Sequence, residues 1–600
     1  MMRFLATKLL QPKLLSSFPT IAINTVTVFQ EKVHQKKTNS FHNVRFCSQT
    51  RWLSDGVDRG GLGTGATYEI CDTKVSPRKK IAVAMSGGVD SSVVAYLLAQ
   101  QYPVEELIGI HMSNWDYADE DPTATTMVQK NEHDSYCWEQ DWKDASAVST
   151  QLNIPIHHVS FQADYWNLVF QPYCQNLSRS ITPNPDVDCN RYIKFGALKE
   201  YLKSHFDEDI GRLATGHYAR IWDRSRTSDG HMEHMPKYLR EAFEAEESPA
   251  LADYILHPSV ADSPLLMSAR DRSKDQSYFL SGVPAEALSG VLFPLGDYYK
   301  TDQGQSFEGI SGDNGDGFSD DDSALSVRQI AQHARLPNAT KKDSVGICFI
   351  GKRKHGNFIN EYVDHPLDDR NGGDASSPTS SLVRYINIEN QEVISTFDPI
   401  DNPSLLYATI GQGAKISGAK QKWFVVDKQL QPPRRADSKA ERTWRSPCIM
   451  VCPGTHHPSL YVNTFFVKSK NFNWIAGGKA NSPPPLPFHA KCRIRHLQPL
   501  VDCEIVMTND HHESIHASSE KTVFDDRTLE IKLKTPMRGI APGQVCAVYA
   551  GGEDGDLICL GGGPVHKTGK SYWDMQQNLP ETLHPSGHND SSIVKKKLGS

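Results

Sequence analysis

The sequence predicts an α/β protein: a doubly wound parallel sheet, followed by a small, mostly β central domain and a C-terminal β-barrel. Between residues 79 and 345, short apolar runs alternate with helical patterns, which is typical of parallel strands joined by crossover helices. From about residue 350, strand-like segments separated by Gly, Pro, Asn and Asp dominate, which favours small β domains and a barrel. The length of 600 residues allows roughly three to four domains.

The elements of the α/β part follow in order. An apolar run ends near Met85 and leads through a Gly turn into a helical pattern, which predicts strand, loop and helix. A second strand ends near Met112, a helix and a third strand follow, and a fourth strand ends at the turn of Gly216 and His217. Residues 225–262 are expected to be an insertion with an exposed helix. An amphipathic helix is expected over residues 327–337, where Pro337 ends it.

The predicted domain limits follow from these patterns. They are a presequence (1–53), a linker (54–78), the α/β domain (79–345, with insertions near 225–262 and 302–323), the central domain (346–442), the barrel (443–568) and a polar tail (569–600).

Charge is unevenly distributed along the chain. The net charge is −7, which by itself argues against a nucleic-acid partner. Residues 302–323, however, hold seven acidic side chains and no Lys or Arg, and they are rich in Gly and Ser. This segment is typical of a disordered insertion, so the remaining chain can still present a basic face. No run of about 18 apolar residues occurs, which argues against a membrane span.

The N-terminus has the composition of a mitochondrial transit peptide. Through Arg51 it contains eight basic residues and a single acid, Glu31, with Ser, Thr and short apolar groups between them. A disordered basic tail and a plastid address are the alternatives, and Pro19 makes a secretory signal a poorer fit. The expected location is therefore the mitochondrial matrix.

Twelve cysteines occur without a repeated spacing, unlike a disulfide scaffold. Cys448 and Cys452, followed by His456 and His457, are similar to a zinc ligand set. The same residues fit a strand that ends in a turn, in which cysteine acts as a small hydrophobic residue. We favour the strand because no second cysteine pair follows at finger spacing, and we predict no metal site of protein ligands.

Residues 86–92, "SGGVDSS", lie where the first strand meets the first helix. Glycines allow backbone N–H groups to approach an anion, and the helix N-terminus adds partial positive charge. The segment therefore predicts a phosphate-binding loop, although it lacks the Gly-Lys-Ser/Thr of a Walker A motif.

This loop resembles the PP-loop of N-type ATP pyrophosphatases, which have an adenine nucleotide alpha hydrolase-like fold. The resemblance implies that ATP and Mg²⁺ are bound and that ATP is split to AMP and diphosphate. Asp90 would help to hold Mg²⁺, and Met112 would line the adenine pocket. The ATP-binding residues that it implies are Ala84, Met85, Ser86, Gly87, Gly88, Val89, Asp90, Ser91, Met112 and Gly216.

Five further motifs, "TPNPDVDCN", "ATGHYAR", "KDQSYFL", "KKDSVGICFIG" and "APGQ", occur in this order. Together with the loop they resemble the tRNA-specific 2-thiouridylase family over residues 79–565, and the presequence resembles that of a mitochondrial member. The resemblance implies thiolation at carbon 2 of the wobble uridine (position 34) of mitochondrial tRNAs, of the Lys, Glu and Gln type. A persulfide donor downstream of a cysteine desulfurase would supply the sulfur.

Such chemistry needs two cysteines. Adenylation turns the uracil oxygen into a leaving group, and a persulfide delivers sulfur only when a second thiolate breaks its S–S bond. By resemblance, Cys348 carries the persulfide, Cys189 is its partner, and Asp186 acts on the base as acid or base or orients it. Asp188 departs from the apolar residue usual beside that cysteine. Because a carboxylate would raise the pKa of the thiol, we expect Asp188 to point away from the sulfur.

The resemblance also implies a set of tRNA-contacting residues. Gly413 stands where the family usually has Arg, which puts one phosphate contact in doubt, and Lys415 is a candidate to replace it. The implied contacts are Asn184, Pro185, Asp186, His217, Lys274, Asp275, Gln276, Arg495, His496 and Gln544.

Two other functions remain open from the sequence. One is a different PP-loop adenylating ligase, which would not need the cysteine pair. The other is a catalytically inactive tRNA-binding protein on the same scaffold.

Overall fold

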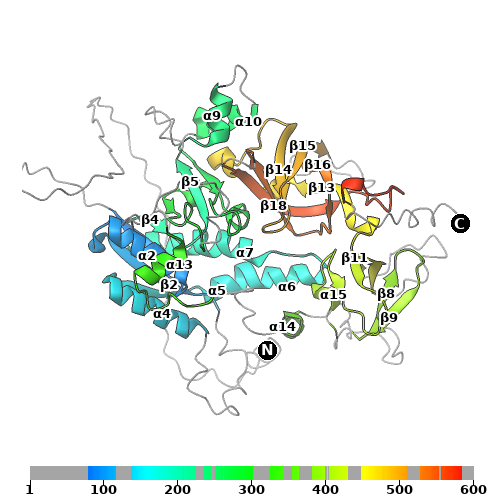
Figure 1. Cartoon of the computed structure of the whole chain (residues 1–600), viewed down its shortest axis with the longest axis horizontal. Coiled ribbons are helices and arrows are strands. Elements are labelled where there is room, and N and C mark those ends of the chain that lie inside the picture. Colours follow the sequence, from blue (N-terminus) through cyan, green and yellow to red (C-terminus); the bar gives the residue numbers. More distant parts are fainter. Residues whose placement is uncertain are drawn as a thin grey trace, which may run out of the picture. The chain divides into compact units, whose positions relative to one another are not determined.

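The computed structural model describes most of the chain beyond residue 78 (Figure 1). The described residues are 79–115, 137–206, 209–223, 235–244, 250–260, 262–301, 325–343, 355–363, 382–398, 402, 404–429, 447–509, 527–552 and 556–583. Within these ranges, no helix is both long and apolar enough to cross a bilayer. The expected presequence, linker and acidic insertion lie outside them.

The first sheet is parallel, as predicted. Its strands lie in the order β3-β2-β1-β4-β7, and every neighbouring pair is parallel. Ile81 and Val83 of β1 pack on one face of the sheet, and Ala82 packs on the other, so both faces are buried. Its strands are β1 (Lys80–Ala84), β2 (Leu107–Ser113), β3 (Ile156–Ser160), β4 (Ile210–Ala214) and β7 (Val291–Leu292).

Helices cover this sheet, and α2 and α13 lie against one another. The amphipathic helix predicted over residues 327–337 is present as α13, which begins with a capping box between Ser326 and Gln329. It ends at His333, before the predicted end at Pro337, and Arg335 has a positive φ of 51°. The longer helices are α2 (Val89–Gln101), α4 (Cys137–Leu152), α6 (Gln171–Ser178), α8 (Leu198–His205), α13 (Val327–His333) and α14 (His355–Tyr362). The shorter ones are α5 (Gln162–Tyr165), α7 (Pro185–Asp188), α11 (Ser277–Leu280), α12 (Ala285–Leu288) and α15 (Ser404–Tyr407).

The central sheet has the order β10-β11-β12-β8-β9. Its strands are β8 (Val383–Asn387), β9 (Val393–Phe397), β10 (Gly413–Ala414), β11 (Trp423–Gln429) and β12 (Cys448–Pro453). The predicted limit at residue 443 is wrong here, because β12 pairs with β11 and β8 and so belongs to this sheet. Cys448 and Cys452 are buried in β12, so the strand predicted for them is confirmed.

The predicted C-terminal barrel is confirmed. Six antiparallel strands follow one another in the order β13-β16-β15-β14-β17-β18, and pairing of β13 with β18 closes the barrel. The strands are β13 (Tyr461–Lys468), β14 (Phe488–Arg493), β15 (Val501–Asn509), β16 (Arg527–Arg538), β17 (Val545–Ala550) and β18 (Ile558–Thr568).

Two parts of the predicted α/β domain belong to the barrel. The strands β5 (Ala219–Asp223) and β6 (Pro264–Ser268) form a hairpin, and β6 pairs with β18. Between them, α9 (Lys237–Glu244) and α10 (Ala250–Leu256) pack on the barrel core. The helix expected to be exposed is therefore partly buried: Leu239 has no exposed surface, because its apolar face covers the barrel.

Candidate functional site

The glycine loop lies between β1 and α2 and is held in one conformation. Gly87 has φ +76°, and a side-chain carbon there would lie 2.2 Å from the carbonyl oxygen of Asp141 in α4, so only glycine fits. The Ser91 hydroxyl accepts from the Ser86 N–H and donates to the Gly88 carbonyl, both at 3.1 Å. A side chain on Gly216 would lie 3.0 Å from the Ser91 nitrogen, so the β4–β5 turn supports the loop closely. These contacts preorganise an anion-binding loop.

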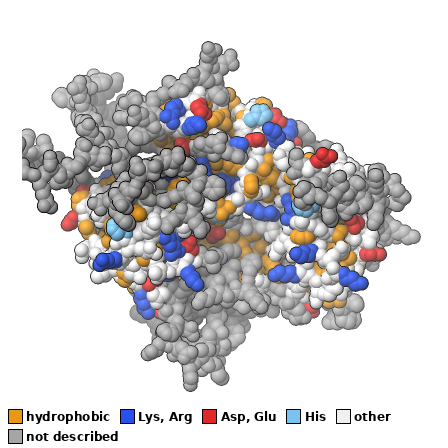
Figure 2. Space-filling view, viewed as in Figure 1, with side chains coloured by type: hydrophobic (Ala, Val, Ile, Leu, Met, Phe, Trp, Pro, Cys, Tyr) orange, Lys and Arg blue, Asp and Glu red, His pale blue; other side chains and the backbone are white. Residues whose placement is uncertain are grey.

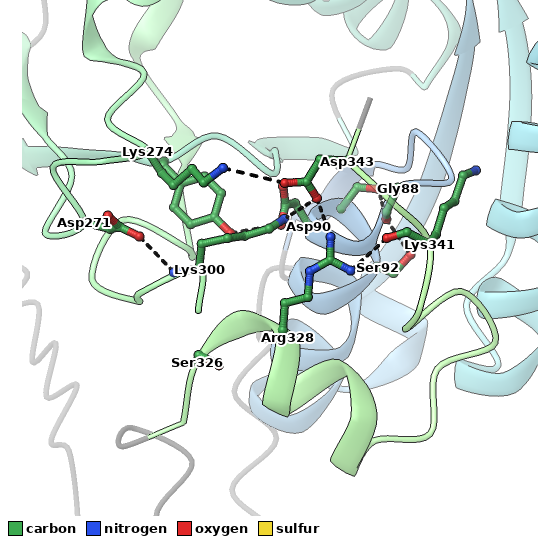
Figure 3. Close-up of polar contacts among 12 residues, drawn as sticks. Gly88, Asp90, Ser92, Asp271, Lys274, Lys300, Ser326, Arg328, Lys341 and Asp343 are labelled. Carbon is green, nitrogen blue, oxygen red and sulfur yellow. Dashed lines mark hydrogen bonds and ion pairs between the residues drawn. The ribbon is translucent and has the colours of Figure 1, made fainter. Parts of the chain in front are cut away.

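A network of charges surrounds the start of α2 (Figure 3). The buried ammonium of Lys300 contacts the carboxylate of Asp90, which also accepts a hydrogen bond from the Tyr218 hydroxyl at 2.9 Å. Lys300 lies 3.1 Å from Asp343, which also pairs with Arg328 at 2.6 Å. Burial alone would raise the pKa of Asp343, but the hydrogen bond and charge of Lys300 and the charge of Arg328 lower it.

A second cation supports the loop from the other side. The Lys341 ammonium lies 3.2 Å from the Gly87 carbonyl oxygen and 2.7 Å from the carboxylate of Asp141. The Asn338 amide donates to the same carbonyl and to the Ser92 hydroxyl, both at 2.9 Å. The loop therefore lies between two lysines that come from distant parts of the sequence.

The loop residues fit a nucleoside triphosphate with its divalent ion. The glycines leave room for phosphate oxygens, the helix N-terminus favours negative charge, and lysines lie on two sides. The described residues contain no cluster of three or more His, Cys, Asp or Glu that could hold a metal ion. Mg²⁺ would accordingly be held by Asp90 together with the phosphates, as is usual for this ion.

One residue expected to bind ATP, Met85, has no backbone polar group free to hydrogen-bond with it and no exposed side chain. Both backbone polar groups of Met85 are already used: its N–H donates to Ile110 and its carbonyl bonds to His111, each at 2.8 Å. Its side chain is buried, as is that of Val89. The expected contact of Met85 with ATP remains a prediction, as does that of Met112, which is half-buried at the end of β2.

Hydrogen bonds connect the β4–β5 turn, which packs against the glycine loop at Gly216, with the segment that begins at Cys189. His217 follows Gly216, and its ring bonds to the Thr215 hydroxyl at 2.7 Å and to the Asn190 side chain at 3.1 Å. Burial, with the charge of Lys194, lowers the pKa of His217 well below its ordinary value, so the ring is neutral. His217 is 8% exposed, and both of its ring nitrogens are engaged within the protein, so its expected contact with tRNA remains a prediction.

Cys189 begins a π-helical segment (Cys189–Ala197) directly after α7 and is 3% exposed. The Asn184 side chain caps α7 by accepting from the Val187 N–H. Burial raises the pKa of Asp186, an effect that the charges of Lys194 and His496 oppose. Burial likewise raises the pKa of Asp188 to about 6, which Arg191 opposes. Cys348 lies outside the described residues, so the predicted meeting of the two cysteines remains a prediction.

A cavity of about 410 Å³ lies beside α7. It brings together four of the residues expected to contact tRNA: Asn184, Arg495, His496 and Gln544. The other lining residues are Thr182, Pro183, Tyr278, Thr409, Ile410, Gly411, Gln412 and Ile494. Segments from the α/β part, the central sheet and the barrel therefore share one polar pocket.

Close backbone contacts create this cavity. The Thr182 N–H donates to the Pro542 carbonyl at 2.8 Å, and Gly543, with φ +88°, approaches Ile181 so closely that a side-chain carbon would lie 2.3 Å away. The "APGQ" turn of the barrel is thereby held against the loop that precedes Cys189. The His496 ring hydrogen-bonds to the Asp275 carbonyl oxygen at 2.8 Å, and its centroid lies 4.3 Å from that of Phe279.

Three residues of the "KDQ" motif lie apart from this cavity. Asp275 has no exposed surface, and its carboxylate accepts from Ala269, Ser277 and Arg493. The side chain therefore holds the local structure together, and the expected contact of Asp275 with tRNA remains a prediction. The Gln276 side chain accepts from the Tyr218 N–H, and the half-exposed ammonium of Lys274 lies 3.7 Å from Asp343. Pro185 is also buried.

The sequence interpretation missed Lys300, Arg328 and Asp343. Asp343 lies in the quoted "KKDSVGICFIG" motif, so a signal for it was available. Lys300 carries no local signal, because it contacts Asp90, 210 positions away. Arg328 pairs with Asp343 only 15 positions away, but the pair matters because Asp343 also contacts Lys300.

The fold and the loop define a nucleotide-binding protein of the PP-loop class. A family model described as "tRNA methyl transferase HUP domain" matches residues 79–306 and 323–352, and one described as "Aminomethyltransferase beta-barrel domain" matches residues 511–565. The tRNA-specific 2-thiouridylase of Geobacillus kaustophilus is 32% identical over 488 residues, which are 81% of this chain and 94% of that protein.

Mitochondrial proteins are also among the relatives. The mitochondrial tRNA-specific 2-thiouridylases of chicken and mouse are each 29% identical to this chain. The matches cover 83% and 86% of this chain and 94% and 98% of those proteins. The chain belongs to the tRNA-specific 2-thiouridylase family.

Proposed function

We propose that this protein is a tRNA 2-sulfurtransferase. It adenylates the wobble uridine of mitochondrial tRNAs with ATP and Mg²⁺ and replaces the 2-oxygen by sulfur, which gives 2-thiouridine. The observation that carries this proposal is the shared cavity. Asn184, Arg495, His496 and Gln544 line it, and Cys189 follows the adjoining helix. Hydrogen bonds of His217 join the Cys189 segment to the turn that packs against the glycine loop.

The first step is activation of the base. The loop of residues 86–92 and Lys300 bind the phosphates of ATP, and ATP supplies the adenylyl group that turns the uracil 2-oxygen into a leaving group. The uridine leaves the anticodon stack to enter the cavity, as bases do when chemistry is performed on them. There, the ring of His496 offers a stacking surface, and the Asn184 and Gln544 amides offer hydrogen bonds to base edges.

The second step is sulfur transfer. The terminal sulfur of a Cys348 persulfide attacks carbon 2, and AMP departs with the original oxygen. The Cys189 thiolate attacks the inner sulfur of Cys348, which breaks the persulfide bond and leaves a Cys189–Cys348 disulfide. A dithiol reductant then restores both thiols. Asp186 protonates, deprotonates or orients the base, and burial raises its pKa above the ordinary value, which favours proton exchange with the base.

The chain offers a short covalent path between the two sites. Asp343, which pairs with Lys300 beside the glycine loop, precedes Cys348 by five residues. Five residues span at most about 18 Å. This short separation in the sequence supports the role proposed for Cys348.

The partners follow from the same chemistry. The substrates are tRNAs of the Lys, Glu and Gln type, and a persulfide donor downstream of a cysteine desulfurase loads Cys348. Mitochondrial relatives and the basic, acid-poor N-terminus support a location in the mitochondrial matrix. On the face shown in Figure 2, Lys and Arg side chains are interspersed with apolar ones, which suits an RNA partner despite the net negative charge.

Deletion of the gene tests this proposal. Mass spectrometry of nucleosides from mitochondrial tRNA should show loss of 2-thiouridine, and an unchanged level would overturn the proposal. In vitro, Cys348→Ser should abolish thiolation and leave tRNA affinity within a few-fold of wild type. Cys174→Ser is the matched control, because Cys174 is half-buried in α6 and has no proposed role.

A further inference from the structure

Two arginines meet where the central sheet joins the barrel. Gly411 (φ +83°) and Gly539 (φ +67°) lie back to back there, and a side-chain carbon on Gly539 would lie 3.1 Å from the Gly411 Cα. A side-chain carbon on Gly539 would also lie 3.1 Å from Nη2 of Arg495. A side-chain carbon on Gly411 would lie 3.3 Å from Nη1 of Arg538. The two glycines thus allow a close backbone approach, with one guanidinium on each side of it.

The protein provides hydrogen-bond acceptors for only some of the N–H groups of these two guanidinium groups. Arg495 donates through Nη2 to the carbonyls of Ile410, at 3.3 Å, and Gly539. Arg538 donates through Nε to the Thr455 carbonyl at 2.8 Å, and its guanidinium carbon lies 5.1 Å from the centroid of the Phe424 ring. Nη2 of Arg538 is buried and has no hydrogen-bond partner. Across the ranges that the structure describes, neither arginine pairs with a carboxylate.

Two neighbouring cations without a counter-ion repel one another. Burial, and after it the charge of Arg538, lowers the pKa of Arg495. A buried N–H donor without an acceptor is also costly, because it has lost its hydrogen bonds to water. Both features are relieved by one bound anion that accepts hydrogen bonds from the two guanidinium groups.

The position of the two arginines indicates which anion they bind. Arg495 and Gly411 line the cavity, and Nη1 of Arg538 lies close to Gly411, so a ligand held by both arginines would adjoin the proposed uridine site. A guanidinium matches phosphate oxygens with paired N–H donors and is weakly hydrated, which makes arginine well suited to RNA backbone contacts.

We propose that Arg495 and Arg538 together bind one backbone phosphate of the tRNA at the rim of this cavity. Arg538, which the sequence analysis did not identify, is thereby a tRNA-binding residue. The inference rests on the proposed function, because the phosphate belongs to the RNA whose uridine enters the cavity. The inference also offers a replacement for the arginine that the family usually has at the position of Gly413. Arg538 reaches the nearby turn at Gly411 from the barrel and supplies a cation there.

The test compares Arg538→Gln with Arg527→Gln in the full chain. The two arginines lie at opposite ends of β16, and Arg527 is exposed, so it is a matched control. Anisotropy of labelled tRNA over a range of salt concentrations should show about tenfold weaker binding for Arg538→Gln. The slope of log affinity against log salt should fall by about one, because one phosphate contact is lost. Arg527→Gln should bind with wild-type affinity and slope.

Two further variants separate phosphate binding from packing. Arg538→Lys should retain most of the salt slope and lose affinity only a few-fold, because it keeps the charge and loses the paired donors. The double variant of Arg495→Gln and Arg538→Gln should lower the slope no further than either single variant, because both arginines share one phosphate. ATP binding and the thermal midpoint of Arg538→Gln should match wild type.

Several results would overturn the inference. These are an unchanged salt slope in Arg538→Gln, an equal loss in Arg527→Gln, or a lowered thermal midpoint that Arg538→Lys does not restore. Failure of the proposed function is distinguishable, because a wild-type protein that binds tRNA but forms no 2-thiouridine would contradict that function and leave the phosphate site standing. Conversely, wild-type binding by Arg538→Gln with normal 2-thiouridine formation would remove the phosphate site alone.

Discussion

The ammonium of Lys300 contacts the carboxylate of Asp90, although 210 residues separate them in the chain. Lys300 is 3% exposed at its side chain, and Asp90 is the acidic residue in the first turn of α2. The contact places a buried positive charge beside the loop that we propose for the phosphates of ATP. We therefore expect Lys300 to stabilise the folded loop and to bind its ligand.

Replacement of this lysine tests that dual role. Lys300→Met should lower the free energy of unfolding by about 2–3 kcal/mol, because two carboxylates lose their buried partner. It should also weaken ATP binding at least about tenfold, because a charge contact to phosphate disappears. Urea denaturation and calorimetric ATP titration measure the two effects. Lys237→Met is the control: its pair with Glu241 is exposed, so stability should change by less than about 0.5 kcal/mol.

The role of Gly87 can be tested by comparing its substitution with that of another glycine that has the same φ angle. Gly87 and Gly454 both have φ +76°, but only Gly87 lies against Asp141, whereas a side chain on Gly454 would meet nothing within 4 Å. Gly454→Ala should cost about 1 kcal/mol from backbone strain. Gly87→Ala should cost about 3 kcal/mol or more and slow ATP consumption. Equal effects of the two substitutions would show that the contact with α4 is unimportant.

Cys189 should be essential for turnover and dispensable for binding. Cys189→Ser should reduce multiple-turnover 2-thiouridine formation by about a hundredfold or more, because the persulfide bond is no longer broken by a second thiolate. Release of diphosphate in the presence of tRNA should continue, since adenylation precedes sulfur transfer. Nucleoside mass spectrometry and a diphosphate assay measure the two steps. Loss of both would assign Cys189 to the structure of the site instead.

Asp188 should make stability depend on pH. Its pKa is about 6 in the folded protein, above the ordinary value of 3.8, so the folded state binds the proton more tightly than the unfolded state. Stability from this group is therefore present at low pH and is lost as pH rises from about 4 to 6, by up to about 3 kcal/mol. Asp188→Asn should flatten the pH dependence of unfolding over this interval.

The same variant tests the expected direction of this side chain. If Asp188 points away from the sulfur of Cys189, Asp188→Asn should change the rate of thiolation at neutral pH by less than about threefold. A strong acceleration would show that the carboxylate suppresses the thiolate.

The sequence by itself determined the parallel sheet, the glycine loop, the barrel and the membership of the cysteines in recognisable motifs. These features are local: hydrophobic alternation, Gly turns and helix patterns are set by residues close together in the chain. The predicted loop of residues 86–92, the helix α13 and the strand β12 appear in the structure for this reason.

Only the tertiary structure decided which distant segments meet. Strand pairing placed β12 in the central sheet and the β5–β6 hairpin beside the barrel, against the predicted domain limits. It also turned Asp275 and His217 inward and brought Arg538 to the turn at Gly411. The physical reason is that burial and pairing depend on the neighbours each side chain acquires across the fold, and no local pattern in the sequence encodes those neighbours.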